Sequence, residues 1–247
     1  KRVWFHSSSM GEFEQAKPII AELKKRHPEV EVVVSFFSPS GYDHSKNYKL
    51  ADVICYLPFD SKRNAERFLS IIQPTVAVMV RYDVWPNHLW ELKRKNTPVF
   101  IANATFRKHW AKNLPFFHQF FIDVYNSIDY IFTVSEKDKN GFQEFELLHP
   151  VIEAIGDTRF DQVWRRSAES RNRHVLPNHV IAGKKVLVIG SSWLEDEEVL
   201  FPALIESHRQ HEQLLTVLVP HEPDEETLER IEFMLNGKIS NIRLSSL

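Results

Sequence analysis

The stretch VWFHSSSMGEFEQAKPII (residues 3–20) decides the fold, because a short apolar run passes through a small polar turn into a helical pattern. Beyond the turn, apolar residues recur at i, i+3, i+4 and i+7 and give one apolar helix face: Ala16, Ile19, Ile20 and Leu23. Pro18 has no backbone donor, so we expect it to kink this helix. Strand, turn and helix in this order predict the opening of a β-α-β fold.

The same alternation continues along the chain. Several apolar runs are continuous, as in strands buried on both faces of a parallel sheet. The expected strands are residues 3–5, 30–37, 53–57, 75–80, 99–102, 130–134, 151–155, 185–189 and 214–219. The expected helices are residues 61–72, 87–95, 110–127, 136–145, 194–210 and 225–235. This rhythm predicts a doubly wound α/β architecture.

A long charged segment, residues 156–185, interrupts the rhythm before a new β-α-β unit begins. We therefore predict two Rossmann-like domains, residues 1–155 and residues 156–247, with a ligand at the carboxyl ends of the strands. The opening KRVWF and the closing NIRLSSL both have strand patterns. The ends therefore look cut, and we expect the second domain to be truncated.

Composition excludes several classes of protein. The net charge of -2, with 43% hydrophobic and 26% charged residues, is ordinary for a soluble globular protein and gives no reason to expect nucleic-acid binding. No apolar run approaches the roughly 20 residues of a membrane span. The single cysteine, Cys55, lies in an apolar run and is expected to be a buried free thiol. The histidines are scattered without a metal-binding motif, so no metal is expected.

Glu12 would lie in the first turn of the opening helix, at the carboxyl end of a strand. Ser8 or Ser9 can cap the helix, and Gly11 allows close backbone approach or a positive φ. Neither a dinucleotide fingerprint nor a Walker A motif is present. Glu12 is either a helix-dipole acid, worth about 0.3–1 kcal/mol, or a catalytic carboxylate on a ligand-binding turn.

A second carboxylate is expected on the same rim. In VRYDVWPNHLW (residues 80–90), a buried strand leads to Asp83, and Pro86 fits the first turn of a helix. Of two carboxylates that face one cleft, one can act as a general base while the other orients the substrate. The alternative is that Asp83 caps the helix or pairs with Arg81.

Basic and aromatic residues follow the next strand end, Asn103. Arg107, Lys108 and nearby basic side chains could meet phosphate groups or could form a solvated loop. The phenylalanine-rich segment 114–125 predicts core packing or a surface that touches lipid.

Two weaker features lie in the second half. Ser191 and Ser192 follow a strand and precede an acidic helix start, which predicts an anion cradle. His221 and Glu222 follow the next strand.

Taken together, these segments resemble the 3-deoxy-D-manno-octulosonic acid (Kdo) transferase family. The matching motifs are HSSSMGE, YLPFD, DVWPN, IANATFRKHW, GDTRFD, GSSWLEDEE and VPHEPDEE, in the order of the family and over nearly the whole chain. The resemblance implies a GT-B glycosyltransferase with two Rossmann-like domains. It implies transfer of Kdo from CMP-Kdo to a sugar hydroxyl of the lipid A precursor, with inversion and without metal or cofactor. It also implies work at the cytoplasmic face of the bacterial inner membrane.

The resemblance also implies roles for residues. Glu12 matches the proposed general base, and Asp83 is expected to be catalytic beside it. The residues expected to bind the acceptor are Ser9, Gly11, Trp85, Asn87, Asn103, Arg107 and Lys108. The residues expected to bind the donor are Gly156, Arg159, Ser191, Ser192, His221 and Glu222.

This sequence departs from the family pattern at several points. Arg81 stands where many members have the first glutamate of Glu-Thr-Glu, the VPHEPD turn lacks the usual arginine, and Arg159 replaces a lysine. The membrane-anchoring start and the Gly-Gly-His-Asn…Glu-Pro region of the family are also absent, so we expect an inactive fragment of an active enzyme. The alternatives are another GT-B enzyme that uses a UDP-sugar, such as lipid A disaccharide synthase or an epimerase, and a non-catalytic lipid- or nucleotide-binding module.

Overall fold

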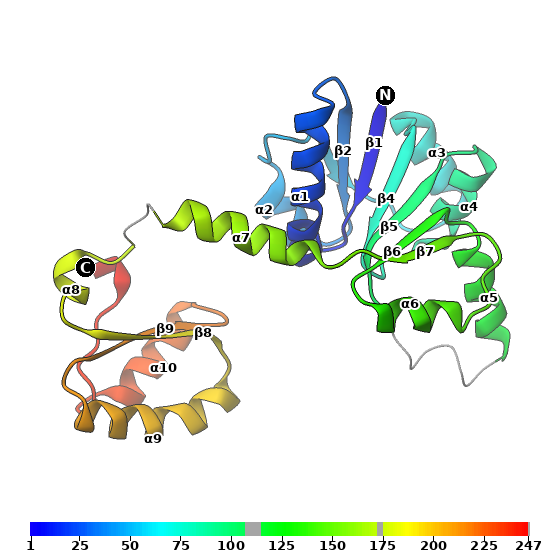
Figure 1. The fold of residues 1–247 in the computed structure, drawn as a ribbon. Coiled ribbons are helices and arrows are strands. Elements are labelled where there is room, and N and C mark those ends of the chain that lie inside the picture. Colours follow the sequence, from blue (N-terminus) through cyan, green and yellow to red (C-terminus); the bar gives the residue numbers. More distant parts are fainter. Residues whose placement is uncertain (107–114, 172–174, 247) are drawn as a thin grey trace. The chain divides into compact units, whose positions relative to one another are not determined.

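The computed structural model describes residues 1–106, 115–171 and 175–246. The chain divides into two compact units, Lys1–Ala168 and Glu169–Leu247 (Figure 1). The first unit extends beyond the predicted boundary at residue 155 because it includes most of helix α7 (Thr158–Ser170). No helix within the described ranges is long and apolar enough to cross a membrane.

The first unit is built on a seven-stranded parallel sheet with the order β3-β2-β1-β4-β5-β6-β7. Every apolar run predicted in this part of the chain is a strand. The strands are β1 (Arg2–His6), β2 (Glu31–Phe36), β3 (Val53–Tyr56), β4 (Val76–Val80), β5 (Val99–Ala104), β6 (Tyr130–Thr133) and β7 (Val151–Ala154).

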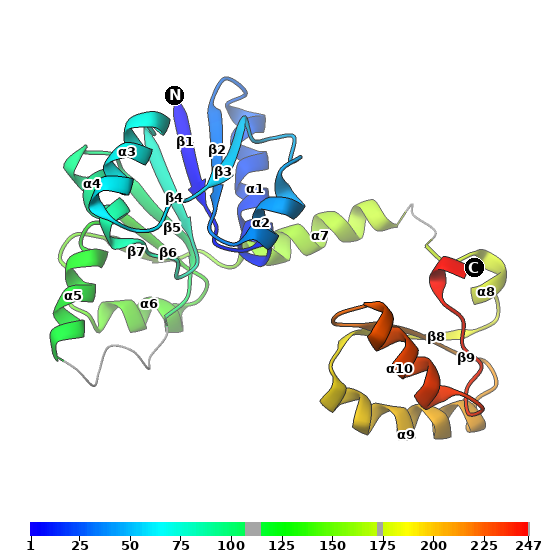
Figure 2. The same ribbon diagram turned by 180° about the vertical axis from the view of Figure 1, so that it is seen from behind.

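Helices cover both faces of this sheet (Figures 1 and 2). They are α1 (Met10–Arg26), α2 (Pro39–Ser45), α3 (Lys62–Ile72), α4 (Pro86–Arg94), α5 (Pro115–Tyr125) and α6 (Glu136–Gln143), whereas α7 follows β7 and has no buried residue. Helix α1 passes through Pro18 without a break. The sequence did not predict α2 or α7, and the predicted start of α5 at residue 110 lies outside the described residues.

Two apolar layers hold the sheet between its helices. Side chains of successive strand residues point to opposite faces, so Trp4 joins the layer that includes Leu69 and Leu89 of α3 and α4. Phe5 joins the layer that includes Phe13 and Ile20 of α1. This burial on both faces explains why the strands have continuous apolar runs instead of alternating ones.

The second unit has a parallel pair of strands, β8 (Lys185–Ser192) and β9 (Leu214–Pro220). Its helices are α8 (Asn178–Ile181), α9 (Leu194–Gln210), α10 (Glu225–Leu235) and the 3-10 helix η1 (Leu244–Ser246). The sequence predicted α9 and α10 but not α8.

The predicted strand at 241–247 is wrong within the described residues, which end in η1. Arg243 binds Glu225 and Glu232 of α10 at 2.7 and 2.6 Å. These two ion pairs tie the segment to α10, and it joins no strand ladder there.

Candidate functional site

The strand order has a switch point between β1 and β4. The chain moves from β1 towards β2 and β3, and from β4 towards β5, so the connections diverge at the carboxyl ends of two neighbouring strands. Ligands of open α/β sheets bind in the crevice outside such a point. Glu12 follows β1 and Asp83 follows β4, so both predicted carboxylates come from the strands that form it.

Glu12 is held by the turn that starts α1. Its Oε2 accepts hydrogen bonds from the backbone N–H of Ser9 at 2.8 Å and from Ser9 Oγ at 3.0 Å. The acid at this helix position closes a capping box and lies at the positive end of the helix dipole. The Glu12 side chain is nearly buried, with the residue 6% exposed. The cap and the carboxylate at the strand end are thus the same residue.

Asp83 is bound by two residues of the β1 segment. His6 Nε2 lies 3.1 Å from Asp83 Oδ2, and Ser8 Oγ donates to the same oxygen. Burial alone would raise the pKa of Asp83, but the hydrogen bonds and charge of His6, together with Ser8, bring it below its ordinary value. Asp83 is therefore an anion at neutral pH. The predicted alternative, a pair with Arg81, is not what holds it.

His6 continues a buried polar chain into the sheet. Its Nδ1 lies 2.8 Å from Ser35 Oγ, which accepts the indole N–H of Trp4 at 2.8 Å. The side chains of Trp4, His6 and Ser35 are all fully buried. Because Ser8 and Asp83 both meet Nε2, with Ser8 Oγ at 3.5 Å, the arrangement is not a Ser-His-Asp nucleophile triad, in which hydroxyl and carboxylate meet opposite ring nitrogens.

Consecutive serines therefore hold the two carboxylates. Ser8 binds Asp83 and Ser9 binds Glu12, within the turn between β1 and α1. Any shift of this turn would move both acids together.

The YLPFD and DVWPN motifs meet at the start of α4. Asp60 accepts hydrogen bonds from the backbone and side-chain amides of Asn87, both at 3.1 Å, and from His88 Nδ1 at 2.8 Å. Burial raises the pKa of Asp60, but the bonds from His88 and Asn87 outweigh it and lower the pKa overall. Asn87, predicted to bind the acceptor, here uses its side-chain amide to anchor α4.

Trp85 contributes an aromatic wall beside the carboxylates. Its ring lies edge-on to His6, with centroids 5.7 Å apart, and 4.7 Å from the ring of the exposed Phe37. Arg81 takes a left-handed backbone conformation, φ 67°, which is strained for a residue other than glycine. Such strain at a strand end is common at ligand sites.

The Asn-Ala strand end and the GDTRFD motif are joined. Asn103, 1% exposed and with φ 56°, donates through Nδ2 to Thr158 Oγ1 at 2.6 Å and accepts from the Thr158 N–H at 3.2 Å. Gly156, with φ +100°, permits the turn that brings Thr158 there. The Arg159 guanidinium binds Asp157 at 2.6 Å, so Gly156 and Arg159 lie with the first unit.

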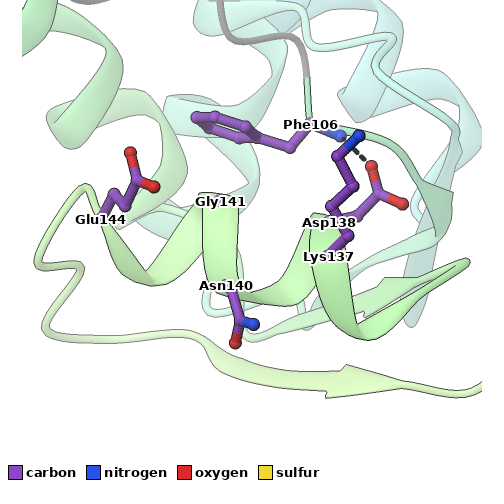
Figure 3. A pocket seen from close by; sticks show the side chains of 6 residues that line it. All are labelled: Phe106, Lys137, Asp138, Asn140, Gly141 and Glu144. Carbon is purple, nitrogen blue, oxygen red and sulfur yellow. Dashed lines mark hydrogen bonds between the residues drawn. The ribbon is translucent and has the colours of Figure 1, made fainter.

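A pocket of about 410 Å³ lies beside α6, lined by Phe106, Lys137, Asp138, Asn140, Gly141 and Glu144 (Figure 3). Asp138 accepts the N–H of Phe106 at 2.8 Å and also the hydroxyl of Ser135, which caps α6. This carboxylate is therefore used for local structure. The predicted acceptor residues Arg107 and Lys108 follow Phe106 and lie outside the described residues.

In the second unit, Ser191 and His221 come together, with Oγ and Nδ1 2.7 Å apart, and the His221 ring stacks on Trp193. Ser192 Oγ instead donates to the buried Glu197 at 3.0 Å. Asp196 accepts the N–H of Trp193 at 3.0 Å. The carboxylates of Glu197 and Asp196 thus already bind hydrogen-bond donors at the predicted anion-binding turn. Glu222 follows β9 and is exposed.

Three residues of this rim were not predicted from the sequence: His6, Asp60 and Thr158. All three stand inside recognised motifs, HSSSMGE, YLPFD and GDTRFD, so the motifs were a signal that was not used. Among the described residues, no three His, Cys, Asp or Glu side chains lie close enough to hold a metal ion.

A parallel sheet of this order with helices on both faces, as in the solved structures that share this fold, defines an α/β protein of the GT-B type. Residues 1–162 match the family model described as 3-Deoxy-D-manno-octulosonic-acid transferase (kdotransferase), and the chain belongs to this family.

Curated relatives agree with the family match. The 3-deoxy-D-manno-octulosonic acid transferase of Rickettsia felis is 25% identical over 90% of this chain and 47% of its own length. The enzyme of the same name from Haemophilus influenzae is 23% identical, over 90% of this chain and 52% of its own length. The chain thus spans about half the length of the curated relatives it matches.

Solved structures agree on the fold. UDP-GlcNAc 2-epimerase from Neisseria meningitidis, bound to UDP-GlcNAc, has a TM-score of 0.70 at 14% identity, covering 99% of this chain and 73% of its own. A putative UDP-N-acetylglucosamine 2-epimerase from Listeria monocytogenes has a TM-score of 0.69 at 15% identity, covering 98% of this chain and 68% of its own. At such identity the likeness concerns the fold alone.

Proposed function

We propose that the protein carrying this sequence moves Kdo from CMP-Kdo to a sugar hydroxyl of the lipid A precursor, with inversion at the anomeric centre. Membership of the Kdo transferase family supports the reaction class. The observation that carries the assignment of roles is Glu12, a nearly buried carboxylate at the switch point whose Oε2 is fixed by Ser9.

In the proposed step, Glu12 takes the proton of the acceptor hydroxyl through its other oxygen, Oε1. The hydroxyl oxygen then bonds to the anomeric carbon of Kdo as the bond from that carbon to the phosphate oxygen breaks and CMP leaves. The transition state has oxocarbenium character, as in other glycosyl transfers. Since CMP is a good leaving group, the proposed reaction needs no metal.

The remaining expectations belong to the same proposal. Asp83 would orient the acceptor beside Glu12, and Asn103, Trp85, Arg107 and Lys108 would line the acceptor side. Ser191 and His221 would contribute to the donor side. The membrane-embedded lipid A precursor would place the reaction at the cytoplasmic face of the bacterial inner membrane.

The test is Glu12→Gln, which keeps the shape and removes the base. Kdo transfer should fall by about two to four orders of magnitude, the usual contribution of general-base catalysis. CMP-Kdo binding should be unchanged. Glu22→Gln, at the exposed far end of the same helix, is the matched control and should be fully active. Near-normal turnover in Glu12→Gln would refute the base assignment.

A UDP-sugar reaction is the competing function within the same fold. Calorimetric titration with CMP-Kdo and with UDP-GlcNAc separates the two. Binding of UDP-GlcNAc without binding of CMP-Kdo would overturn the proposal. Binding of CMP-Kdo without any transfer would instead support a non-catalytic binding module.

A further inference from the structure

We infer that His6 is a positioning residue of this site: it holds Asp83 in one orientation, and through Ser8 it fixes the turn that carries Glu12. The inference deepens the proposed function and rests on it. It starts from the fully buried ring of His6, which has no exposed surface with which to touch a substrate. Its effect on the reaction must therefore pass through another side chain.

The hydrogen bonds assign a proton to the ring nitrogen that faces Asp83. The indole of Trp4 can only donate, so Ser35 Oγ accepts from it at 2.8 Å. An ionised carboxylate can only accept, so the ring nitrogen that faces Asp83 at 3.1 Å carries the proton. The other ring nitrogen, Nδ1, lies 2.8 Å from Ser35 Oγ, so the ring is bonded at both of its nitrogens. Every polar atom in this chain of contacts has a partner.

The sheet fixes the position of the ring. His6 and Ser35 are direct partners in the ladder between β1 and β2, and the ring of Trp85 covers His6 edge-on at 5.7 Å. A donor fixed in this way on a central strand gives Asp83 a defined place. A fixed position matters for the reaction rate, since misplacement of a reacting group by about 1 Å can lower the rate a hundredfold.

Asp83 in turn holds the turn between β1 and α1 in place. Its Oδ2 accepts the hydroxyl of Ser8, and the next residue, Ser9, binds Glu12. Loss of His6 would leave Ser8 as the donor to the Asp83 carboxylate and remove the donor that is fixed on the sheet. Ser8 and the turn would then be bonded to a less firmly held carboxylate, although no group in contact with the substrate had been removed.

The kinetic test uses His6→Leu and His6→Gln in the protein carrying this sequence. In His6→Leu, kcat for Kdo transfer should fall about ten- to a hundredfold while the KM for CMP-Kdo stays within about twofold. His6→Gln keeps an N–H that can reach Asp83 and should recover most of kcat. His149→Leu is the matched control. His149 pairs with Asp129 at 3.3 Å, and these two residues precede β7 and β6, so they lie at the amino ends of the strands, away from the carboxyl-end rim. Wild-type kcat in a folded His6→Leu variant would overturn the inference.

A second measurement does not depend on activity or on folding of the leucine variant. Nitrogen-15 NMR of histidine-labelled protein, with the His6 signals identified by their absence in His6→Gln, should show the proton on Nε2 in the wild type. A wild-type Nε2 without a proton would refute the inference. If the wild type transfers no Kdo, the proposed function fails, while this measurement still decides the geometry.

Discussion

The hydroxyl of Thr158 donates a 2.6 Å hydrogen bond to the backbone carbonyl of Gln15, joining α7 to α1 across 143 positions of sequence. The same hydroxyl accepts from the buried Asn103, and further along α7 Arg166 binds Glu14. These contacts attach α7 to the first unit through polar groups. They also connect the GDTRFD motif to the helix that begins with Glu12.

Thr158→Val should therefore destabilise the first unit. The substitution keeps the shape of the side chain but leaves the Asn103 amide without its acceptor, which costs about 1–3 kcal/mol for a buried group. Urea unfolding should show this loss. Thr97→Val, at a half-buried threonine just before β5, is the control and should change stability by much less. Equal effects at both positions would contradict the role given to Thr158.

Asp60 should make stability depend on pH. Its pKa is lowered overall in the folded protein, because the bonds from His88 and Asn87 outweigh burial. A depressed folded pKa stabilises the protein above the unfolded pKa, about 3.9, and this stability is lost as pH falls through the folded pKa. Asp60→Asn should thus cost about 2 kcal/mol at pH 7.

The difference between Asp60→Asn and wild type should shrink as the pH is lowered towards about 2. Unfolding curves recorded across this range provide the measurement. The exposed Asp43 serves as comparison, and Asp43→Asn should have little effect at any pH. A difference for Asp60→Asn that is constant with pH would show that its ionisation is not linked to folding.

Substitution by alanine should affect stability at Gly141 but not at Gly11. A Cβ at Gly141 would lie 2.3 Å from the Phe106 ring, so Gly141→Ala should destabilise by about 1–3 kcal/mol. A Cβ at Gly11 meets nothing within 4 Å, and Gly11 is helical, contrary to the positive φ that the sequence allowed. Gly11→Ala should keep stability but raise the KM for the acceptor. Unchanged acceptor KM would remove Gly11 from the site.

Cys55 should react slowly while the protein is folded. Cys55 is half-buried and not fully buried as predicted, and this burial raises the pKa of its thiol to about 11, so very little thiolate exists at pH 8. Alkylation by iodoacetamide should be slower by roughly two orders of magnitude than in urea, where the pKa returns to about 8.5. Equal rates in both states would mean that the thiol is accessible and unshifted.

The strands were predictable because burial on both faces leaves long apolar runs in the sequence. Helix α7 was not predictable, because it is attached through the polar side chains of Thr158, Gln162 and Arg166. In the sequence, such residues look like those of a charged linker. Its apolar residues mislead as well, since Phe160 and Trp164 are exposed. Periodicity detects helices held by an apolar face, and α7 is held by polar contacts.

The rim carboxylates were predictable for a different reason. Parallel strands end at one edge, so Glu12 and Asp83 had to lie on the same side of the sheet. His6 could not be assigned, because its role depends on the ladder register that places it opposite Ser35 and on the return of the chain to Asp83. Asn87 was recognised as part of a motif, but its bond to Asp60 depends on a loop after another strand.

Ser8 and Ser9 are neighbours in the chain, and one trans peptide keeps their Cα atoms about 3.8 Å apart. The distance between the anchors of Asp83 and Glu12 is therefore fixed by covalent geometry and not by packing. Thermal expansion of the core would leave this distance unchanged, whereas insertion or deletion of one residue in the turn would change it. Natural variation in this family should accordingly tolerate exchanges of side chains around the turn far better than changes in its length.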